Sequence, residues 1–372
     1  MSGVQVHPVR TRGDFREFVQ LPYRLHARDR NWVPPFRRGM FRALDRRTSP
    51  FYQEAQIEEF VARDSRGVCV GRIAAVIQPA YVERHGPKAF FGFFESQNDE
   101  QVARALLACV EGWAAERGFK TVVGPYSHQD SGVLIDGFET PPALLQAYNP
   151  RYYPLLLASC GYTPIFEMSA YTLTAEEIRP RVAETIARGE EVAAHNDLTT
   201  RGMDLSQYDD EVEMLRRLYN ESFAMHPESV PISRLVFQAL AEDLRPVLDP
   251  SLVRIIEARR KPVGFCVMVP NINEFLIGRS GRLTPFLLLR WKALMAKVRS
   301  VVVVWIGVDP ALVGKGIGRC LAAEISRAIA SGRYHTAHTT WIHENNRASR
   351  ALFGDLKRPP AKRYAVFEKI IS

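Results

Sequence analysis

Three glycines in the C-terminal part of the chain have the spacing of an anion-binding loop. The run reads Val313, Gly314, Lys315, Gly316, Ile317, Gly318 and Arg319. Glycine allows the backbone to turn its N–H groups toward a ligand, and a helix that begins at such a loop adds partial positive charge. The residue types therefore predict a site for a phosphate or pyrophosphate group.

The elements on either side of this loop would hold it in place. The almost unbroken apolar run 301–308 predicts a buried strand, which ends at Asp309 and Pro310. An amphipathic helix is predicted to follow from Arg319 and to end at Gly332. Other nucleotide-binding folds also place a glycine loop between strand and helix. However, no Lys-Ser or Lys-Thr pair follows the last glycine here, and the acid expected of a dinucleotide site comes too late, at Glu344.

The pattern V-D-P-x-x-x-G-K-G-I-G-R-x-L, which begins at Val308, resembles the acyl-CoA loop of the GCN5-related N-acetyltransferase (GNAT) superfamily. The resemblance implies that the amides of the loop 313–319 hold the CoA pyrophosphate. It also places Val308 and Asn346 in the co-substrate site, where the Val308 N–H would bind the thioester carbonyl. The Arg or Gln usual at the first loop position is Val313 here, so one side-chain contact is missing. An ordinary glycine-rich turn is the alternative interpretation.

The same resemblance guides the choice of catalytic candidates. The family often uses a Glu on the central strand as base and a Tyr on the last helix as acid; this central strand carries no Glu, and Phe353 occupies the Tyr position. Glu344 and His343, at a strand end beside the expected thioester, are the candidate bases, and Tyr364 on the last strand is the candidate acid. The alternatives are a solvated strand end for the first two residues and a packing role for Tyr364.

Composition limits the class of protein. The 372 residues suit two domains, and the content of 46% hydrophobic and 24% charged residues is that of a globular protein. The first residues lack a signal peptide, no apolar run reaches the ~20 residues of a membrane span, and the five cysteines are scattered without a metal-ligand spacing. We therefore predict a cytoplasmic protein without a metal site.

The net charge of +8 leaves several partners open. It suits CoA, an acidic acyl carrier protein, or peripheral contact with an anionic inner membrane. The basic residues are spread along the chain without an interleaved aromatic stripe, so no nucleic-acid partner is predicted.

The order strand, turn, strand, strand, helix, strand occurs twice along the chain. The stretch SLVRIIEARRKPVGFCVMVP matches FVARDSRGVCVGRIAAVIQP in shape, with Gly264 opposite Gly71. We predict an α/β (α+β) protein of two tandem GNAT-like lobes, residues 1–178 and 179–372, each a mixed twisted sheet flanked by helices. A charged helical segment, 178–197, would join them.

The two predicted lobes differ where CoA would bind. The first has ESQND at residues 95–99 in place of a glycine loop, so we predict CoA in the second lobe only. The runs 141–157 and 283–295 are rich in apolar and aromatic residues, which favours a hydrophobic acceptor between the lobes; a plain inter-lobe core is the alternative. Tyr148, Tyr152 and Tyr153 are equally suited to a cleft wall or a core.

The segment 281–300 has apolar residues at helical spacing and basic residues largely off that stripe. The spacing favours packing against the other lobe, and contact with a membrane surface is the alternative. The apolar stripe consists of Leu287, Trp291, Leu294, Met295 and Val298.

The phrases GRIAAVI, FGFFES, GVLIDGF, YNPRYY and WIHENN resemble a bacterial group of tandem GNAT proteins that includes ceramide-forming N-acyltransferases. The resemblance implies transfer of an acyl group from acyl-CoA or acetyl-CoA to a primary amine, with a sphingoid-type acceptor. Two alternatives stay open: a transferase that uses an acyl carrier protein or an aminoacyl donor, and a CoA-binding protein without catalysis.

Overall fold

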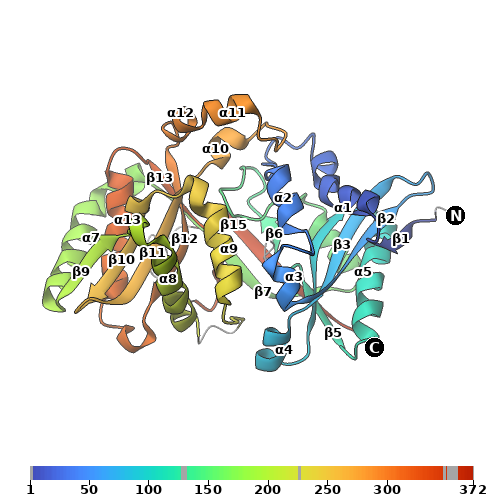
Figure 1. Ribbon diagram of the computed structural model, residues 1–372, viewed down its shortest axis with the longest axis horizontal. Coiled ribbons are helices and arrows are strands. Elements are labelled where there is room, and N and C mark those ends of the chain that lie inside the picture. Colours follow the sequence, from blue (N-terminus) through green and yellow to red (C-terminus); the bar gives the residue numbers. More distant parts are fainter. Residues whose placement is uncertain (1–2, 127–131, 225–227, 347–348, 350–358, 372) are drawn as a thin grey trace.

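The computed structural model describes residues 3–371 apart from 127–131, 225–227, 347–348 and 350–358. Two mixed β-sheets, each flanked by helices, lie next to each other along the long axis of the molecule (Figure 1). The predicted fold class is confirmed.

The first sheet has the order β1-β2-β3-β4-β5-β15-β7-β14, with β6 beside β15. Its strands are β1 (Gln5–Pro8), β2 (Gln56–Arg63), β3 (Cys69–Ile77), β4 (Ala89–Ser96), β5 (Thr121–Gly124), β6 (Val133–Asp136), β7 (Thr163–Ala170), β14 (Ile342–His343) and β15 (Lys362–Ile370). Only the β4–β5 pair is parallel among these described strands. The connection between these two strands is a crossover through helix α5, as a parallel pair requires.

The second sheet repeats this plan in the order β8-β13-β12-β11-β10-β9. Its strands are β8 (Thr172–Thr174), β9 (Leu198–Gly202), β10 (Val253–Ala258), β11 (Lys261–Pro270), β12 (Ser300–Val308) and β13 (Thr336–Thr339). Here β12 and β13 form the parallel pair, and α13 makes the crossover. The strand-helix order predicted twice from the sequence is thus present in both sheets.

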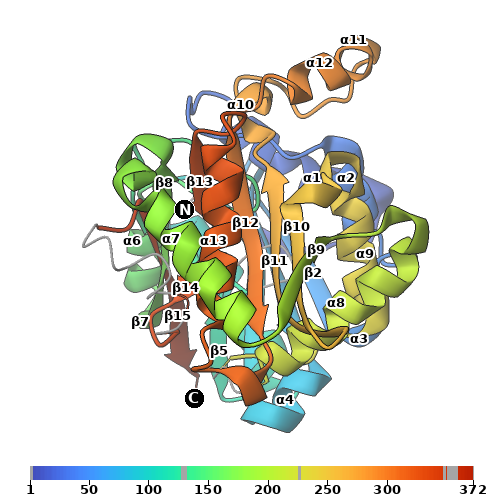
Figure 2. The ribbon, with the colours of Figure 1, turned by 90° about the vertical axis from the view of Figure 1, so that its left-hand side faces the viewer.

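Long helices cover both faces of each sheet. In the first sheet, α5 (Glu100–Ala115) packs on one face and α1 (Arg12–Leu25) on the other. In the second, α7 (Ala175–His195) and α13 (Ile317–Ala330) lie side by side over one face, as Figure 2 shows, and α8 (Tyr208–Ser222) and α9 (Arg234–Leu244) cover the opposite face.

Shorter helices complete the structure. These are α2 (Arg37–Ala43), α3 (Pro50–Glu54), α4 (Pro79–His85), α6 (Tyr153–Ser159), α10 (Asn273–Leu276), α11 (Pro285–Leu289) and α12 (Trp291–Met295), with 3₁₀ turns at Leu205–Gln207, Arg245–Val247, Pro250–Leu252 and Pro310–Leu312.

A glycine at the same place in each sheet lets the crossover helix approach closely. A Cβ atom on Gly71 of β3 would lie 2.7 Å from Leu106 Cδ1 of α5. A Cβ atom on Gly264 of β11 would lie 2.8 Å from Ile317 Cγ2 of α13. No side chain fits between strand and helix at these distances. The pairing of Gly264 with Gly71 read from the sequence therefore reflects an equivalent packing role.

The sheets exchange strands across the predicted lobe boundary at residue 178. β15, the last strand, lies between β5 and β7 in the first sheet, and β8, from the N-terminal half, pairs with β13 in the second. Without β15 the edges of β5 and β7 would be unpaired in the middle of a sheet. The predicted second lobe, 179–372, included the last strand, but β15 is a strand of the first sheet. The boundary at residue 178, as a division into folding units, remains a prediction.

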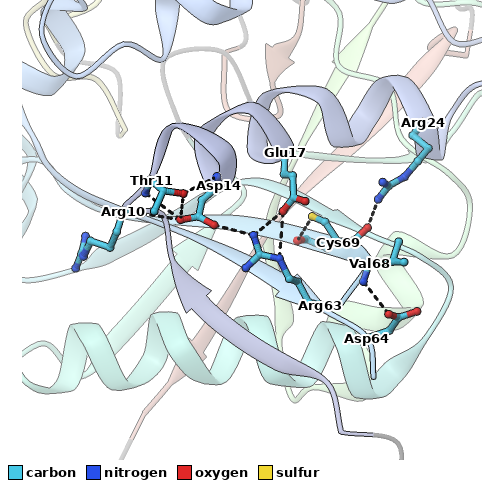
Figure 3. Close-up of polar contacts among 10 residues, drawn as sticks. Arg10, Thr11, Asp14, Glu17, Arg24, Arg63, Asp64, Val68 and Cys69 are labelled. Carbon is cyan, nitrogen blue, oxygen red and sulfur yellow. Dashed lines mark hydrogen bonds and ion pairs between the residues drawn. The ribbon is translucent and has the colours of Figure 1, made fainter. Parts of the chain in front are cut away.

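A charged cluster fixes the start of α1 to β2 (Figure 3). The Asp14 N–H donates to Thr11 Oγ1 at 3.1 Å and the Thr11 N–H donates to the Asp14 carboxylate at 2.9 Å, which is a capping box. From β2, Arg63 Nη2 donates to Asp14 at 2.7 Å and to Glu17 at 2.6 Å. The Arg63 guanidinium lowers the pKa of Asp14 below the usual range of a carboxyl group.

Candidate active site

A cavity of about 970 Å³ lies between the two sheets, within the size range of small-molecule sites. Residues from both lobes line it, and many of them are aromatic. Representative rings are those of Trp32, Phe90, Tyr148, Phe166, Trp305 and Trp341. Such a wall suits an apolar ligand, and the cavity is larger than a small polar amine needs.

The parallel strands β12 and β13 diverge at one wall of this cavity. Their pairing runs from Ser300 with Thr336 to Val303 with Thr339, and Thr340 then donates its N–H to the Val303 carbonyl at 3.2 Å. Beyond this point β12 continues beside β11, while residues 342–343 cross to the first sheet as β14. β12 and β13 therefore form a parallel pair that opens toward the cavity.

A β-bulge marks the same point of β12. Val303 pairs with Met268 and Trp305 pairs with Val267, so Val304 is an extra residue in the ladder. The cavity wall includes residues 303–306 of β12. Val308, the predicted carbonyl donor, lies two residues beyond this stretch and pairs with Gly264.

His343 lies in the cavity wall, on β14. Its ring is buried, packs on Phe166 with ring centroids 4.6 Å apart, and accepts the Asn345 N–H at Nδ1 over 3.0 Å. Burial lowers the pKa of His343, so the ring is neutral at pH 7. Because Nδ1 accepts a hydrogen bond, the proton of the neutral ring is on Nε2, and this nitrogen is a donor.

Of the two candidate residues that follow His343, Glu344 and Asn346, only Asn346 lies at the cavity. Glu344 is exposed and is not among the described cavity-lining residues; its backbone N–H donates to the Glu167 carbonyl at 3.0 Å. Asn346 does line the cavity, and its Oδ1 accepts the Ser349 N–H at 3.0 Å. The structure therefore brings His343 and Asn346 together at the cavity and leaves Glu344 outside it.

Tyr364, the candidate acid, lies in the core of the first lobe. It is 1% exposed, packs in the cluster that contains Met168 and Val366, and does not line the cavity. Burial raises the pKa of Tyr364, and its hydroxyl has no hydrogen-bond partner among the described residues. Phe353, which occupies the family's Tyr position, lies outside the described residues.

The glycine loop has the conformation of an open helix N-terminus. Gly314 and Gly316 have φ angles of 86° and 85°, a region that glycine occupies without strain. Gly316 is the N-cap of α13, and no side chain caps this end of the helix. Val313, Lys315 and Arg319 are exposed beside it. The loop thus offers uncapped N–H groups and two cationic side chains to an anion.

A buried polar cluster on the first-lobe wall includes one residue that the sequence did not reveal. Glu95, at the end of β4, lines the cavity and accepts hydrogen bonds from His26 Nε2 at 2.7 Å and Tyr153 Oη at 2.6 Å. Burial raises the pKa of Glu95, but His26, Arg72 and Tyr153 outweigh burial and leave it lowered. In the sequence Glu95 begins the stretch 95–99 that replaces a glycine loop, and Tyr153 is one of the cleft-wall candidates, whereas His26 lies in an unrelated helical stretch.

The three tyrosines considered for a cleft wall separate into two groups. Tyr148 lines the cavity and donates its hydroxyl to Asp29 at 2.9 Å. Tyr152 and Tyr153 do not line it, and Tyr153 is 2% exposed in the first core.

Within the described ranges, no three His, Cys, Asp or Glu side chains are grouped so that they could hold a metal ion. No helix in the same part of the chain combines the length and apolar character needed to span a bilayer.

Comparison with known proteins supports the fold. The tandem GNAT protein of the clavulanic acid pathway superimposes with a TM-score of 0.56 at 14% identity, covering 99% of this chain and 98% of that one. A GCN5-related N-acetyltransferase from Sphaerobacter thermophilus gives a TM-score of 0.52 at 12% identity, covering 99% and 95% of the two chains. These likenesses show a tandem GNAT fold.

Sequence comparison identifies closer relatives. No family model matches the chain. Protein YghO of Escherichia coli K12 is 27% identical, covering 97% of this chain and 94% of its own. The bacterial ceramide synthase of Caulobacter vibrioides is 30% identical over 385 aligned positions, covering 100% of this chain and 98% of its own. The chain is therefore an acyltransferase with the tandem GNAT fold and belongs to the family of this bacterial ceramide synthase.

Proposed function

We propose that this acyltransferase moves an acyl group from acyl-CoA to the primary amine of a long-chain amino alcohol of the sphingoid type. The observation that carries the proposal is the aromatic cavity of about 970 Å³, which reaches the point where β12 and β13 diverge. The name of the Caulobacter relative, a ceramide synthase, agrees with an N-acylated amino alcohol as product.

The glycine loop supports CoA as the donor. Pyrophosphate carries two negative charges close together, and the uncapped end of α13 with Lys315 and Arg319 provides the complementary charge. The pantetheine arm would extend from this loop into the gap between β12 and β13. Asn346, which lines the cavity, is in a position to contact the same arm.

The size and lining of the cavity support a lipid-like acceptor. Burial of each methylene group contributes about 0.8 kcal/mol, so a long chain gains far more from an aromatic cavity than a small polar amine does. The wall also contains a few polar residues, among them Gln146, Glu228 and Asn273.

The reaction needs mainly correct placement of two reactants. The amine nitrogen attacks the thioester carbon, the C–N bond forms, the C–S bond breaks, and one amine proton is transferred overall to the CoA thiolate. Holding the two groups together supplies up to roughly 7–11 kcal/mol of the barrier reduction. A backbone N–H of β12 between Val304 and Val308 is on the correct strand to bind the carbonyl oxygen.

His343 is the candidate with the best support for a direct role, because it lines the cavity and is neutral. With Nδ1 occupied by the Asn345 N–H, we assign the ring as a donor through Nε2 rather than as a base. As a donor it would polarise the thioester carbonyl or orient an acceptor hydroxyl. Its exposed neighbour Glu344 lacks this support.

The proposal is tested by measuring CoA thiol release with two acceptor series. One series varies the chain length of an amino alcohol with acetyl-CoA as donor, and the other varies the acyl chain of the donor with a fixed acceptor. We expect kcat/KM to rise with acceptor chain length and to exceed the values for spermidine and free amino acids. A preference for the polar amines would overturn the proposal.

A variant with a bulkier side chain in the cavity provides an independent test of where the acceptor chain binds. Ala239 of α9 lines the cavity, so Ala239→Phe should raise KM for long-chain acceptors more than for short ones. Leu235→Phe, at an exposed position of the same helix that does not line the cavity, should leave the chain-length profile unchanged.

A further inference from the structure

Four large apolar side chains are exposed within seven residues at one end of the molecule. They are Leu283 (41% exposed), Phe286 (60%), Leu288 (57%) and Leu289 (85%). The other large apolar side chains that are exposed in the described part of the chain occur singly. This cluster belongs to residues 275–299, which we call the tip segment and which includes α11 and α12.

The tip segment is also strongly basic. It contains six Arg and Lys residues and no Asp or Glu, a formal charge of +6 in a chain whose net charge is +8. All six side chains are exposed, and none forms an ion pair within the described structure. They are Arg279, Arg282, Arg290, Lys292, Lys297 and Arg299. The Arg290 guanidinium lies 5.1 Å from the ring centroid of Phe286, so charged and apolar groups share one surface.

The exposed apolar groups are not needed for the packing of the segment. Its inner side is buried: Leu287 and Val298 are each 1% exposed. Trp291, Leu294 and Met295 pack in the same core cluster as Leu287, whereas Val298 packs in the core under α13. Four of the five stripe residues share a core cluster with first-lobe residues such as Phe36 and Ala143, so the predicted packing against the other lobe is confirmed for these four. The outer leucines and the phenylalanine remain as a second apolar face, and Figure 2 shows α11 and α12 projecting away from both sheets.

The base of the tip segment meets the cavity. Leu276 of α10 and Phe36 both line the cavity, and both belong to the core cluster under the segment. The segment is also fixed to the first lobe, since Arg37 donates its N–H to the Gly281 carbonyl at 2.8 Å and its Nε to the Ser280 carbonyl at 2.9 Å. A ligand that arrives at the tip is thus close to the proposed acceptor site.

We propose that the tip segment docks on an anionic lipid bilayer, with Phe286, Leu288 and Leu289 inserted among the acyl chains and the basic residues on the headgroups. A basic face with protruding aromatic and aliphatic side chains has the composition of an interfacial membrane anchor. The charge alone would suit an acidic protein partner as well, but the exposed apolar side chains beside it favour a bilayer, whose hydrocarbon region would bury them. The purpose of docking, delivery of a lipid acceptor, rests on the proposed function; the docking itself does not.

Vesicle flotation with the full-length protein tests this proposal. We expect binding to phosphatidylcholine vesicles that contain 30% phosphatidylglycerol, weak binding to pure phosphatidylcholine, and a decrease with added salt. Phe286→Ser with Leu289→Ser, and separately Arg290→Gln with Lys292→Gln, should each weaken binding on the order of 10-fold.

Matched variants at other exposed sites control for general changes in surface character. Leu155→Ser with Leu205→Ser, and Arg234→Gln with Lys261→Gln, should leave binding unchanged. Circular dichroism melting should be the same for all variants, because the altered side chains are exposed. Equal vesicle binding by the tip variants, or no binding by the unaltered protein, would overturn the proposal.

Two further results separate the alternatives. Binding of purified acyl carrier protein that is lost in the tip variants, without vesicle binding, would also overturn docking on a bilayer. Vesicle binding by a protein that prefers spermidine as acceptor would support docking and refute the proposed function.

Discussion

The two lobes use the same strand-to-helix junction in opposite ways. After β4 the chain reaches α5 within residues 97–99, and the Asp99 carboxylate accepts the Gln101 N–H at 2.8 Å. After β12 the chain passes through residues 309–316, and α13 begins at Ile317 without a side-chain cap at Gly316. The first junction is capped by its own carboxylate, whereas the second has no side-chain cap and is the junction at which we propose that an external anion binds. The comparison teaches that a duplicated fold keeps its packing and changes its chemistry at a helix end.

The largest expected effect follows from adding a charge to the open junction. At Gly314 a new Cβ would meet no atom within 4 Å, so Gly314→Asp adds negative charge without a steric clash. Repulsion of the CoA pyrophosphate should lower CoA affinity about 100-fold, or roughly 2.7 kcal/mol. Isothermal titration calorimetry measures this change directly.

The controls for Gly314→Asp separate charge from backbone strain. Gly314→Asn has the same shape without the charge and, like Asp, tolerates a positive φ. Gly332→Asp adds the charge beyond the far end of α13, also at a positive φ and in open space. Equal losses in all three variants would mean that the loop is not an anion site, and two CoA sites in the unaltered protein would remove the contrast between the lobes.

The second prediction compares how the lobes respond to acid. His338 of β13 accepts or donates a hydrogen bond with Thr172 Oγ1 at 3.0 Å, and burial lowers the pKa of its ring to about 4 from the ordinary 6.5. The folded state therefore favours the neutral ring. The stability that this ring contributes is fully present above pH 6.5 and is lost as the pH falls toward 4. We expect a loss of about 2 kcal/mol in the free energy of unfolding between pH 8 and pH 5 from this group.

Urea unfolding at several pH values checks this prediction. His338→Gln should flatten the dependence between pH 6.5 and 5, whereas His335→Gln, at an exposed neighbour, should not. The Arg63–Asp14 pair of the first lobe acts at lower pH, because the pKa of Asp14 is already below its ordinary value. An unchanged profile for His338→Gln would show that the ring titrates normally.

The third prediction concerns His343, which lies where the two sheets meet. His343→Leu removes the donor and should lower kcat by about 10-fold, since one hydrogen bond with a net contribution of about 1–1.5 kcal/mol is lost. His343→Gln keeps an N–H donor of similar reach and should retain most of the activity. If His343 were instead a base, both variants would lose activity equally and the acidic limb of the pH–rate profile would disappear.

The paired variant Glu344→Gln tests the remaining base candidate at the same strand end. Glu344 is exposed and outside the described cavity lining, so we expect kcat to be unchanged. A loss of 10²–10⁴ in kcat, which is usual for a missing general base, would contradict this expectation.

The smallest effect is expected in the first-lobe core. Tyr364→Phe removes a buried hydroxyl that has no partner among the described residues. We expect unchanged kcat and a free energy of unfolding that is equal or up to roughly 1 kcal/mol higher. A large fall in kcat at unaltered stability would restore Tyr364 as the catalytic acid.

The sequence was sufficient for the repeated order of strands and helices, because apolar periodicity and glycine positions such as Gly71 and Gly264 depend on local packing. It was not sufficient for the partners of β8 and β15, since strand pairing between distant segments leaves no local pattern. The candidate site was likewise predictable from the sequence only in part. Gly314 and Gly316 have the left-handed φ that the loop pattern predicts, whereas the contact of His26 with Glu95 joins residues 69 positions apart.

The position of β15 also determines when the protein can be completed during synthesis. The first lobe contains the N-terminal residues, yet its sheet lacks a central strand until residues 362–370 have left the ribosome. β5 and β7 therefore have open edges until this strand has been made, and such edges are sites of aggregation. The two lobes are consequently poor units for separate expression, and loss of residues 362–370 would damage the N-terminal half of the protein first.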